Sequence, residues 1–396
     1  MQSKLLEIVR AEHAGVRRVL DPFMGAGTML TEVMEQGLDF AGYDINPLAI
    51  LACKVKAGPF STLDLKQRSD ALLAQIAADT GRSYEASFDG MAKWFSKSTS
   101  IGLSRICRSI KQVEDLWTRQ FYWLCLAETI RQCSNSRTST YKLHIKPNDE
   151  ESSNLASTIE IFKNTVSDNV SRVIVQNRLF SESGVIDAQG KYSGSLDINF
   201  QDVTTLNSDQ VPEKFDLLFT SPPYGDNTTT IPYGQFSYLA LNWIPAADIC
   251  QSIPLNINKN THSIDSASIG GSLKNSKIKA ESLFEKSESF KEFFLGLGDE
   301  KSSHSKRLSS FCFDLHKGVE AFSKLMAPSG YMVWTLGNRS LAGQRVPLDK
   351  IVFELLEHHN IRRVAQFVRP IPSKRMPNRN KSSNTMDTEI VIIAGA

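Results

Sequence analysis

Short apolar strands alternate with amphipathic helical segments near the start of the chain. Val19-Leu20 read as a strand that runs through an acidic residue into a glycine-rich turn, and a helix follows over 28–37. Residues 40–44 read as a second short strand, after which Asn46-Pro47 open another helix that continues through Lys56. Strand, helix and strand in this order predict a βαβ unit, and therefore a mostly parallel sheet with helices on both faces.

This alternation stops after residue 58 and resumes at Leu196. Helical periodicity dominates the segment between them, whereas Phe215–Phe219 read as a buried strand that runs into a proline pair. Later elements are predicted as helices over 311–326 and 351–358 and as strands over 330–336, 364–369 and 389–394. We therefore expect a discontinuous α/β domain over 1–58 and 196–396, a mainly helical insert over 59–195, and a Ser/Asn/Lys-rich polar excursion with one or two short helices over 251–310.

The composition excludes several classes of protein. The chain has 396 residues, and its 41% hydrophobic and 22% charged content is typical of a globular protein rather than a disordered one. Its six cysteines include no CxxC pair, which argues against a disulfide framework or a zinc site. No apolar run reaches the length of a membrane span, and the first residues lead into no signal-peptide core. We expect a cytoplasmic protein with no membrane segment and no metal.

Positive charge is concentrated in two segments, although the net charge of +2 does not by itself indicate a binding partner. Residues 91–146 carry ten Lys and Arg against three acidic residues, and residues 358–386 carry seven against none. Aromatic residues are interleaved among the cations of the first segment: Trp94, Phe95, Trp117, Phe121, Tyr122 and Trp123. Two interpretations stay open, namely a nucleic-acid surface, or a helical core of aromatics under a solvated basic face.

The first candidate site is the turn from Asp21 to Thr28. A strand that delivers a carboxylate into a Gly-x-Gly turn lets a ligand approach the backbone closely, and the amides of the following helix point at that ligand. Asp44 ends the next strand about twenty residues later, where an acidic side chain holds a ribose diol in nucleoside-binding folds. The pair favours a nucleoside-bearing cofactor, and a purely structural turn is the alternative.

The second candidate site is Ser221-Pro222-Pro223-Tyr224, at the end of a hydrophobic strand. Two successive prolines remove two amide donors, so the local carbonyls stay free as acceptors. Together with the Ser221 hydroxyl they are suited to accept both hydrogens of an exocyclic amine, and the Tyr224 ring offers a face for base stacking. The alternative is a proline-stiffened strand exit with a core tyrosine.

These motifs together resemble those of the S-adenosylmethionine-dependent DNA amino-methyltransferases. The resemblance rests on DPFMGAGT at 21–28, YDINP at 43–47 and TSPPY at 220–224, and it extends to YGQFSYLALNW, LMAPSGYMVWTLGNR and IPSKRMP. It implies a Rossmann-like class I methyltransferase fold with S-adenosylmethionine as cofactor. The cofactor-binding residues it implies are Asp21, Pro22, Phe23, Gly25, Gly27, Thr28, Asp44 and Asp202. The catalytic residues it implies are Ser221, Pro222, Pro223 and Tyr224.

The serine form of the catalytic motif resembles enzymes that methylate cytosine N4, and adenine N6 is the alternative target. Methylation at cytosine C5 requires a cysteine nucleophile, typically one that follows a proline, and no cysteine here does so. An RNA or protein-amide methyltransferase and a non-catalytic DNA-binding subunit are further alternatives. The resemblance also implies that the target base leaves the duplex stack to reach the pocket.

Double-stranded DNA is the partner that the resemblance implies, together with a cognate restriction endonuclease or a defence-system partner. We assign DNA recognition to the insert at 59–195, with 251–310 as the competing segment, and expect DNA contacts from Arg131, Arg137, Lys374 and Arg375. In the family, a helical cofactor motif precedes the glycine strand. Here Ser3–Arg10 can supply only part of it, which implies a truncated chain or completion by a partner.

Overall fold

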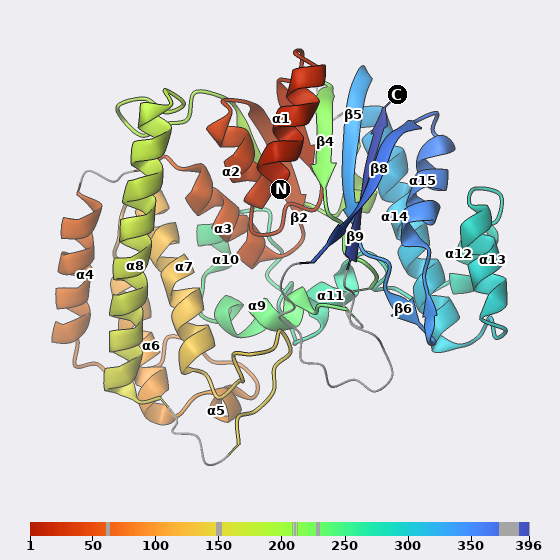
Figure 1. Cartoon of the computed structure of the whole chain (residues 1–396). Coiled ribbons are helices and arrows are strands. Elements are labelled where there is room, and N and C mark those ends of the chain that lie inside the picture. The colour runs from red at the N-terminus through yellow and green to blue at the C-terminus, as the bar shows by residue number, and fades with distance from the viewer. Residues whose placement is uncertain are drawn as a thin grey trace.

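Seven strands form one sheet in the order β3-β2-β1-β4-β5-β9-β8 (Figure 1). The computed structural model describes residues 1–60, 64–147, 153–207, 209, 211, 213–226, 230–371 and 388–395. The strands are β1 (Arg18–Asp21), β2 (Asp39–Asp44), β3 (Leu196–Phe200), β4 (Phe215–Thr220), β5 (Met326–Leu336), β8 (Arg362–Pro370) and β9 (Thr388–Gly395). All neighbours pair in parallel except β9, which is antiparallel to both β5 and β8. A separate two-stranded ladder joins β6 (Ser340–Leu341) to β7 (Gln344–Arg345).

Each face of the sheet has its own hydrophobic core, because successive strand residues point to opposite faces. Val19 and Leu217 belong to a core with α1 (Gln2–Glu12), α2 (Thr28–Glu35) and α3 (Pro47–Ala57). Their neighbours Leu20 and Leu218 belong to a second core with α14 (Ser303–Leu325) and α15 (Leu348–Glu357). The predicted mostly parallel sheet with helices on both faces is confirmed, and the arrangement is a Rossmann-like α/β fold.

The segment between α3 and β3 is helical, as predicted. Its helices are α4 (Leu65–Ala78), α5 (Met91–Trp94), α6 (Lys97–Lys111), α7 (Leu116–Cys133) and α8 (Leu155–Glu182). In this insert all six interleaved aromatic residues are buried, none more than 6% exposed. The interpretation of these rings as helical core is therefore confirmed, and they do not form a surface for bases.

The insert shares one hydrophobic core with the sheet rather than forming a separate unit. The Trp117 indole donates to the Val55 carbonyl of α3 at 3.1 Å, and Trp123 donates to the Asp248 carboxylate at 2.8 Å. Asp248 lies in α10 (Ala246–Ile249) and also pairs with Arg119 at 3.2 Å. Helix α7 therefore packs directly on the α/β part of the chain (Figure 1).

The segment at 251–310 contains more structure than expected. It holds α11 (Ser263–Ala267), α12 (Ser276–Glu281), α13 (Glu288–Gly296) and the first turns of α14, which begins at Ser303 rather than at 311. Phe290 and Phe294 of α13 are buried at 0% and 4% exposure. Three helices and the start of a fourth lie in this Ser- and Lys-rich segment, so the prediction of one or two short helices was wrong.

Candidate cofactor and active site

The glycine turn after β1 requires two backbone conformations that favour glycine. Gly25 and Gly27 have φ of +51° and +74°. A Cβ at Gly27 would lie 2.8 Å from the Cys53 sulfur of α3, whereas a Cβ at Gly25 would have no heavy atom within 4 Å. The Cys53 thiol also donates to the Gly25 carbonyl at 3.3 Å. The turn is therefore held against α3 on one side and open on the other.

Asp44 lies at the carboxyl end of β2 and faces this turn. Its carboxylate accepts the backbone N–H of Gly25 at 3.0 Å and that of Asn46 at 2.8 Å. Asn46 in turn caps α3 by accepting the Leu48 N–H at 3.0 Å. Burial raises the pKa of Asp44 to about 6. Each carboxylate oxygen accepts one bond and keeps capacity for another, as two hydroxyls of a diol would need.

Asp21 joins the ends of the two central strands. Its carboxylate accepts the Thr220 hydroxyl at 2.7 Å and the Phe23 N–H at 3.2 Å. The side chain is 5% exposed, and burial raises its pKa to about 7. Because Thr220 immediately precedes Ser221, this bond places the first predicted motif next to the second.

The other predicted cofactor residues lie around the same edge. Phe23 is half-buried and meets Phe322 edge to face at 6.1 Å, and Pro22 is buried beneath the turn. Thr28 is exposed at the first residue of α2, a position from which backbone amides point at the turn. Asp202 follows β3 and caps the short 3-10 turn Val203–Thr205 by accepting the Thr204 N–H at 2.9 Å.

Strand order explains why these residues lie near one another. Asp202, Asp44, Asp21 and Ser221 follow β3, β2, β1 and β4, which are neighbours in the sheet. The carboxyl ends of parallel strands meet at one edge, where ligands bind in open α/β sheets. The Gln201 N–H also donates to the Asp44 carbonyl at 3.1 Å, which ties the β3 end to the β2 end.

The Ser-Pro-Pro-Tyr segment leaves β4 with its serine exposed. Pro222 is buried, and Pro223 and Tyr224 are half-buried. Within the described part of the chain, no hydrogen bond ties down the Ser221 hydroxyl, so it is available to a ligand. The Tyr224 hydroxyl donates to the Glu389 carboxylate of β9 at 3.0 Å. Sequence analysis missed Thr220 and Glu389, and only Thr220, adjacent to the motif, carried any signal.

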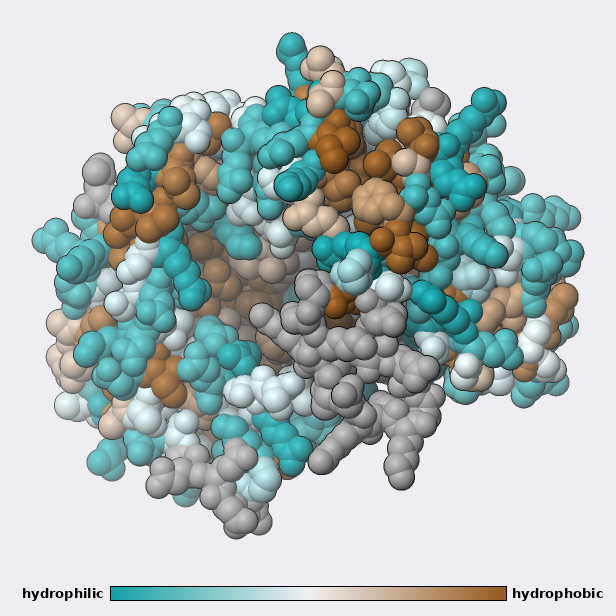
Figure 2. Space-filling model, viewed as in Figure 1, coloured by the Kyte–Doolittle hydropathy of each residue, from teal (hydrophilic) through white to brown (hydrophobic). Residues whose placement is uncertain are grey.

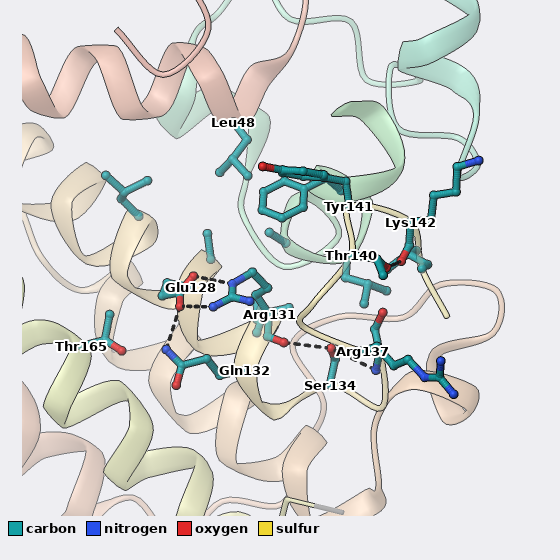
Figure 3. Close-up of a pocket in the computed structure, with 18 of the residues that line it drawn as sticks. Leu48, Glu128, Arg131, Gln132, Ser134, Arg137, Thr140, Tyr141, Lys142 and Thr165 are labelled. Atoms are coloured by element: carbon teal, nitrogen blue, oxygen red, sulfur yellow. Dashed lines mark hydrogen bonds and ion pairs between the residues drawn. The ribbon is translucent and has the colours of Figure 1, made fainter. Parts of the chain in front are cut away.

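A pocket of about 460 Å³ lies beside this edge, between the insert and α9 (Tyr233–Leu241) (Figure 3). Its floor includes Leu124, Leu239 and Ala240, and its walls come from α7, α8 and the loop at 134–147. In the space-filling view it opens as a hollow with an apolar floor near the centre of the face shown (Figure 2). Asn46 of the β2 turn reaches toward it, donating to the Tyr233 carbonyl at 3.3 Å.

The predicted DNA contacts have different surroundings. Arg131 forms a two-bond pair with Glu128, at 2.7 and 2.8 Å, within the pocket wall (Figure 3). Arg137 is exposed on the loop at the pocket rim. Lys374 and Arg375 lie outside the described residues. Across the described ranges, no cluster of three or more His, Cys, Asp or Glu side chains is arranged to hold a metal, and no helix has the length and apolar character needed to cross a membrane.

The fold is Rossmann-like, with the candidate site at the carboxyl edge of its parallel strands, and comparison with known proteins finds similarity to two methyltransferases. The type II methyltransferase M.MvaI of Kocuria varians is 28% identical over 411 aligned residues, which cover 99% of this chain and 87% of the relative. The type II methyltransferase M.MjaII of Methanocaldococcus jannaschii is 37% identical over 65 residues, or 16% of this chain and 12% of its own.

Two further comparisons do not identify a family for this chain. No protein-family profile matches the chain. The solved structure of the rRNA methyltransferase aviRa from Streptomyces viridochromogenes aligns over 99% of this chain and 83% of its own, but with a TM-score of 0.33 and 8% identity. A likeness at that level carries no argument about this protein. The similarity of this chain to methyltransferases therefore rests on the two relatives.

Proposed function

We propose that this protein is an S-adenosylmethionine-dependent DNA methyltransferase that methylates the exocyclic amine of an extrahelical base, with cytosine N4 preferred over adenine N6. The observation that carries the proposal is the Asp21–Thr220 hydrogen bond of 2.7 Å, which holds the glycine turn beside the Ser-Pro-Pro-Tyr segment. A nucleoside-binding edge and an amine-accepting segment are thereby adjacent. Similarity to a type II methyltransferase along nearly the whole chain supports the reaction class.

The residues along the sheet edge fit the proposed cofactor, which supplies an electrophilic methyl group. The open side of Gly25 would leave room for the methionine moiety, and the first amides of α2 would be available to its carboxylate. Asp44 keeps acceptor capacity for two ribose hydroxyls, and Asp202 lies one strand further along for the adenine side. Pro22, Phe23, Gly27 and Thr28 shape the turn around them.

Ser221 and Tyr224 are the residues that we propose act on the base. The exposed Ser221 hydroxyl, with carbonyls that the two prolines leave unpaired, accepts the hydrogens of the target amine. This draws the nitrogen lone pair out of conjugation with the ring and makes it nucleophilic. The Tyr224 ring stacks on the base and stabilises the positive charge that develops at nitrogen through a cation–π contact. Placement and electrostatics then account for the rate.

The proposed DNA surface includes the pocket between the insert and α9. Arg137, Lys142 and Arg172 are exposed around this pocket, and their charges suit phosphate contacts. Arg131 can contact DNA only when its pair with Glu128 opens, whereas Arg137 needs no such change. Lys374 and Arg375 stay predicted DNA contacts. A cognate restriction endonuclease stays a predicted partner. Replacing Arg137 or Lys142 with Ala should lower the salt dependence of DNA binding by about one counterion each.

Mass spectrometry of nucleosides tests the proposed function. DNA is taken from cells that express the chain, from cells that express Tyr224→Ala, and from cells with an empty vector. N4-methylcytosine that depends on Tyr224 is the expected result. N6-methyladenine would retain the mechanism and overturn the base, and the absence of both marks would overturn the proposed activity.

A further inference from the structure

We infer that Glu389 and Arg369 are positioning residues for Tyr224, holding the ring at the angle that base stacking and methyl transfer require. This inference rests on the proposed function and assigns it two residues that lie outside every predicted motif. Both belong to the antiparallel pair β8–β9 at the far side of the sheet, and Glu389 is 165 residues from Tyr224 in sequence.

The three side chains form a chain of directed contacts. Arg369 and Glu389 are register partners in the β8–β9 ladder. The Arg369 guanidinium binds one Glu389 oxygen through Nη2 at 2.6 Å and Nε at 2.8 Å. The other oxygen of Glu389 accepts the Tyr224 hydroxyl at 3.0 Å. The carboxylate is therefore fixed on one side by a cation and is used on its other side only to hold the phenol.

Burial of this contact makes it strong. The Glu389 side chain is 15% exposed and that of Arg369 is 33% exposed. Burial and the adjacent carboxylate raise the pKa of the Tyr224 phenol above its ordinary value, so the hydroxyl keeps its proton and donates. A charge-assisted hydrogen bond is shorter and stronger than a neutral one, and it restricts rotation of the ring.

The same contact also affects the electronic character of the ring. A phenol that donates to a carboxylate has its O–H bond polarised toward the ring, which makes the aromatic face more electron-rich. A more negative face binds a developing cation better. If the Arg369–Glu389 pair served only to close the β8–β9 hairpin, it would need no tyrosine hydroxyl from the β4 exit.

A double-mutant cycle on the full chain tests this inference. Single-turnover methyl transfer from labelled cofactor to plasmid DNA from an unmethylated host is measured for wild type, Glu389→Ala, Tyr224→Phe and the double variant. We expect each single variant to lose about tenfold in the transfer rate, as the loss of a charge-assisted bond predicts. The double variant should lose no more than either single variant, and cofactor affinity should be unchanged.

Two further variants separate positioning from folding. Glu389→Gln keeps an acceptor oxygen but loses the charge, so it should recover only part of the lost rate. Glu320→Ala breaks the pair with Lys324 on α14, outside the segments considered for DNA recognition, and should leave the rate unchanged. Thermal melting of each variant identifies any that fail to fold.

Each outcome bears on one of the two proposals. Multiplicative losses in the double variant, or full activity of a folded Glu389→Ala, would overturn the positioning role while leaving the proposed function intact. If Glu389→Ala gives too little folded protein, the Tyr224→Phe and Glu389→Gln variants decide. A loss in Tyr224→Phe that exceeds the loss in Glu389→Gln supports the positioning role, and full activity of a folded Tyr224→Phe overturns it. A wild-type protein that transfers no methyl group would overturn the proposed function and this inference with it.

Discussion

Replacing Asp21 with Asn should make the folded protein more stable at neutral pH, and the gain should grow with pH. Asp21 is 5% exposed and joins the ends of β1 and β4, and burial raises its pKa from 3.8 to about 7. Because the folded state holds this proton more tightly than the unfolded state, the carboxyl contributes less stability as pH rises from about 4 to about 7. Above pH 7 the loss levels off.

The size of the effect follows from the pKa shift. A shift of this size at about 1.4 kcal/mol per pH unit is worth roughly 4 kcal/mol as an upper bound. The quantity to measure is the free energy of unfolding of Asp21→Asn minus that of wild type. It should increase by roughly 3 kcal/mol between pH 5 and pH 8. Taking the difference cancels the titration of the other groups. Asn keeps an acceptor for Thr220 and Phe23, so the local hydrogen bonds are retained.

Urea unfolding without cofactor at several pH values measures this difference directly. Thr220→Val serves as the matched control, since it removes a bond that stabilises the ionised carboxylate and should extend the pH-dependent loss of stability to higher pH. A stability difference that stays flat between pH 5 and pH 8 would refute the reasoning, because it would mean that the folded state does not hold the Asp21 proton.

Three other predictions concern the turn, the cofactor carboxylate and the insert. Gly27→Ala should lower the free energy of unfolding in urea by about 1–3 kcal/mol, because of its positive φ and the contact of its Cβ with Cys53. Adding Cys53→Ala should restore part of this loss. Calorimetry should show that affinity for S-adenosylmethionine rises about tenfold between pH 5 and pH 7.5 as Asp44 ionises, and that Asp44→Asn binds weakly with no such rise. Trp123→Ala should lower the free energy of unfolding by about 3–5 kcal/mol. Two separate unfolding transitions in the same urea experiment would contradict a core shared by the insert and the sheet.

The local elements could be predicted because short sequence windows encode them. The strand, glycine turn and helix from Val19 onward, and the proline pair after β4, are found where the pattern puts them. The helix around Phe290, Phe293 and Phe294 was underestimated because the Ser- and Lys-rich composition of the surrounding segment was given more weight than this local apolar pattern.

The site was predicted only in part, for a physical reason. Each motif is contiguous, so its residues could be named from spacing alone, and the strand order then brings the motifs to one edge. Glu389 reaches Tyr224 only because β9 inserts antiparallel between β5 and β8. No pattern within either segment encodes that partner, since it depends on the register of a sheet assembled from distant parts of the chain.

Helix α3 has a consequence for experiments that would test the proposed recognition role of the insert by exchanging it. Its first turn is capped by Asn46 beside the Asp44 carboxylate, and its last turn receives the Trp117 indole from the insert at 3.1 Å. The insert is therefore not an interchangeable module. A replacement segment must rebuild the packing against α3 and the contacts to Asp248, or it will also disturb the candidate cofactor site beside Asp44. Grafts that keep α7 intact and vary the loop at 134–147 avoid this linkage.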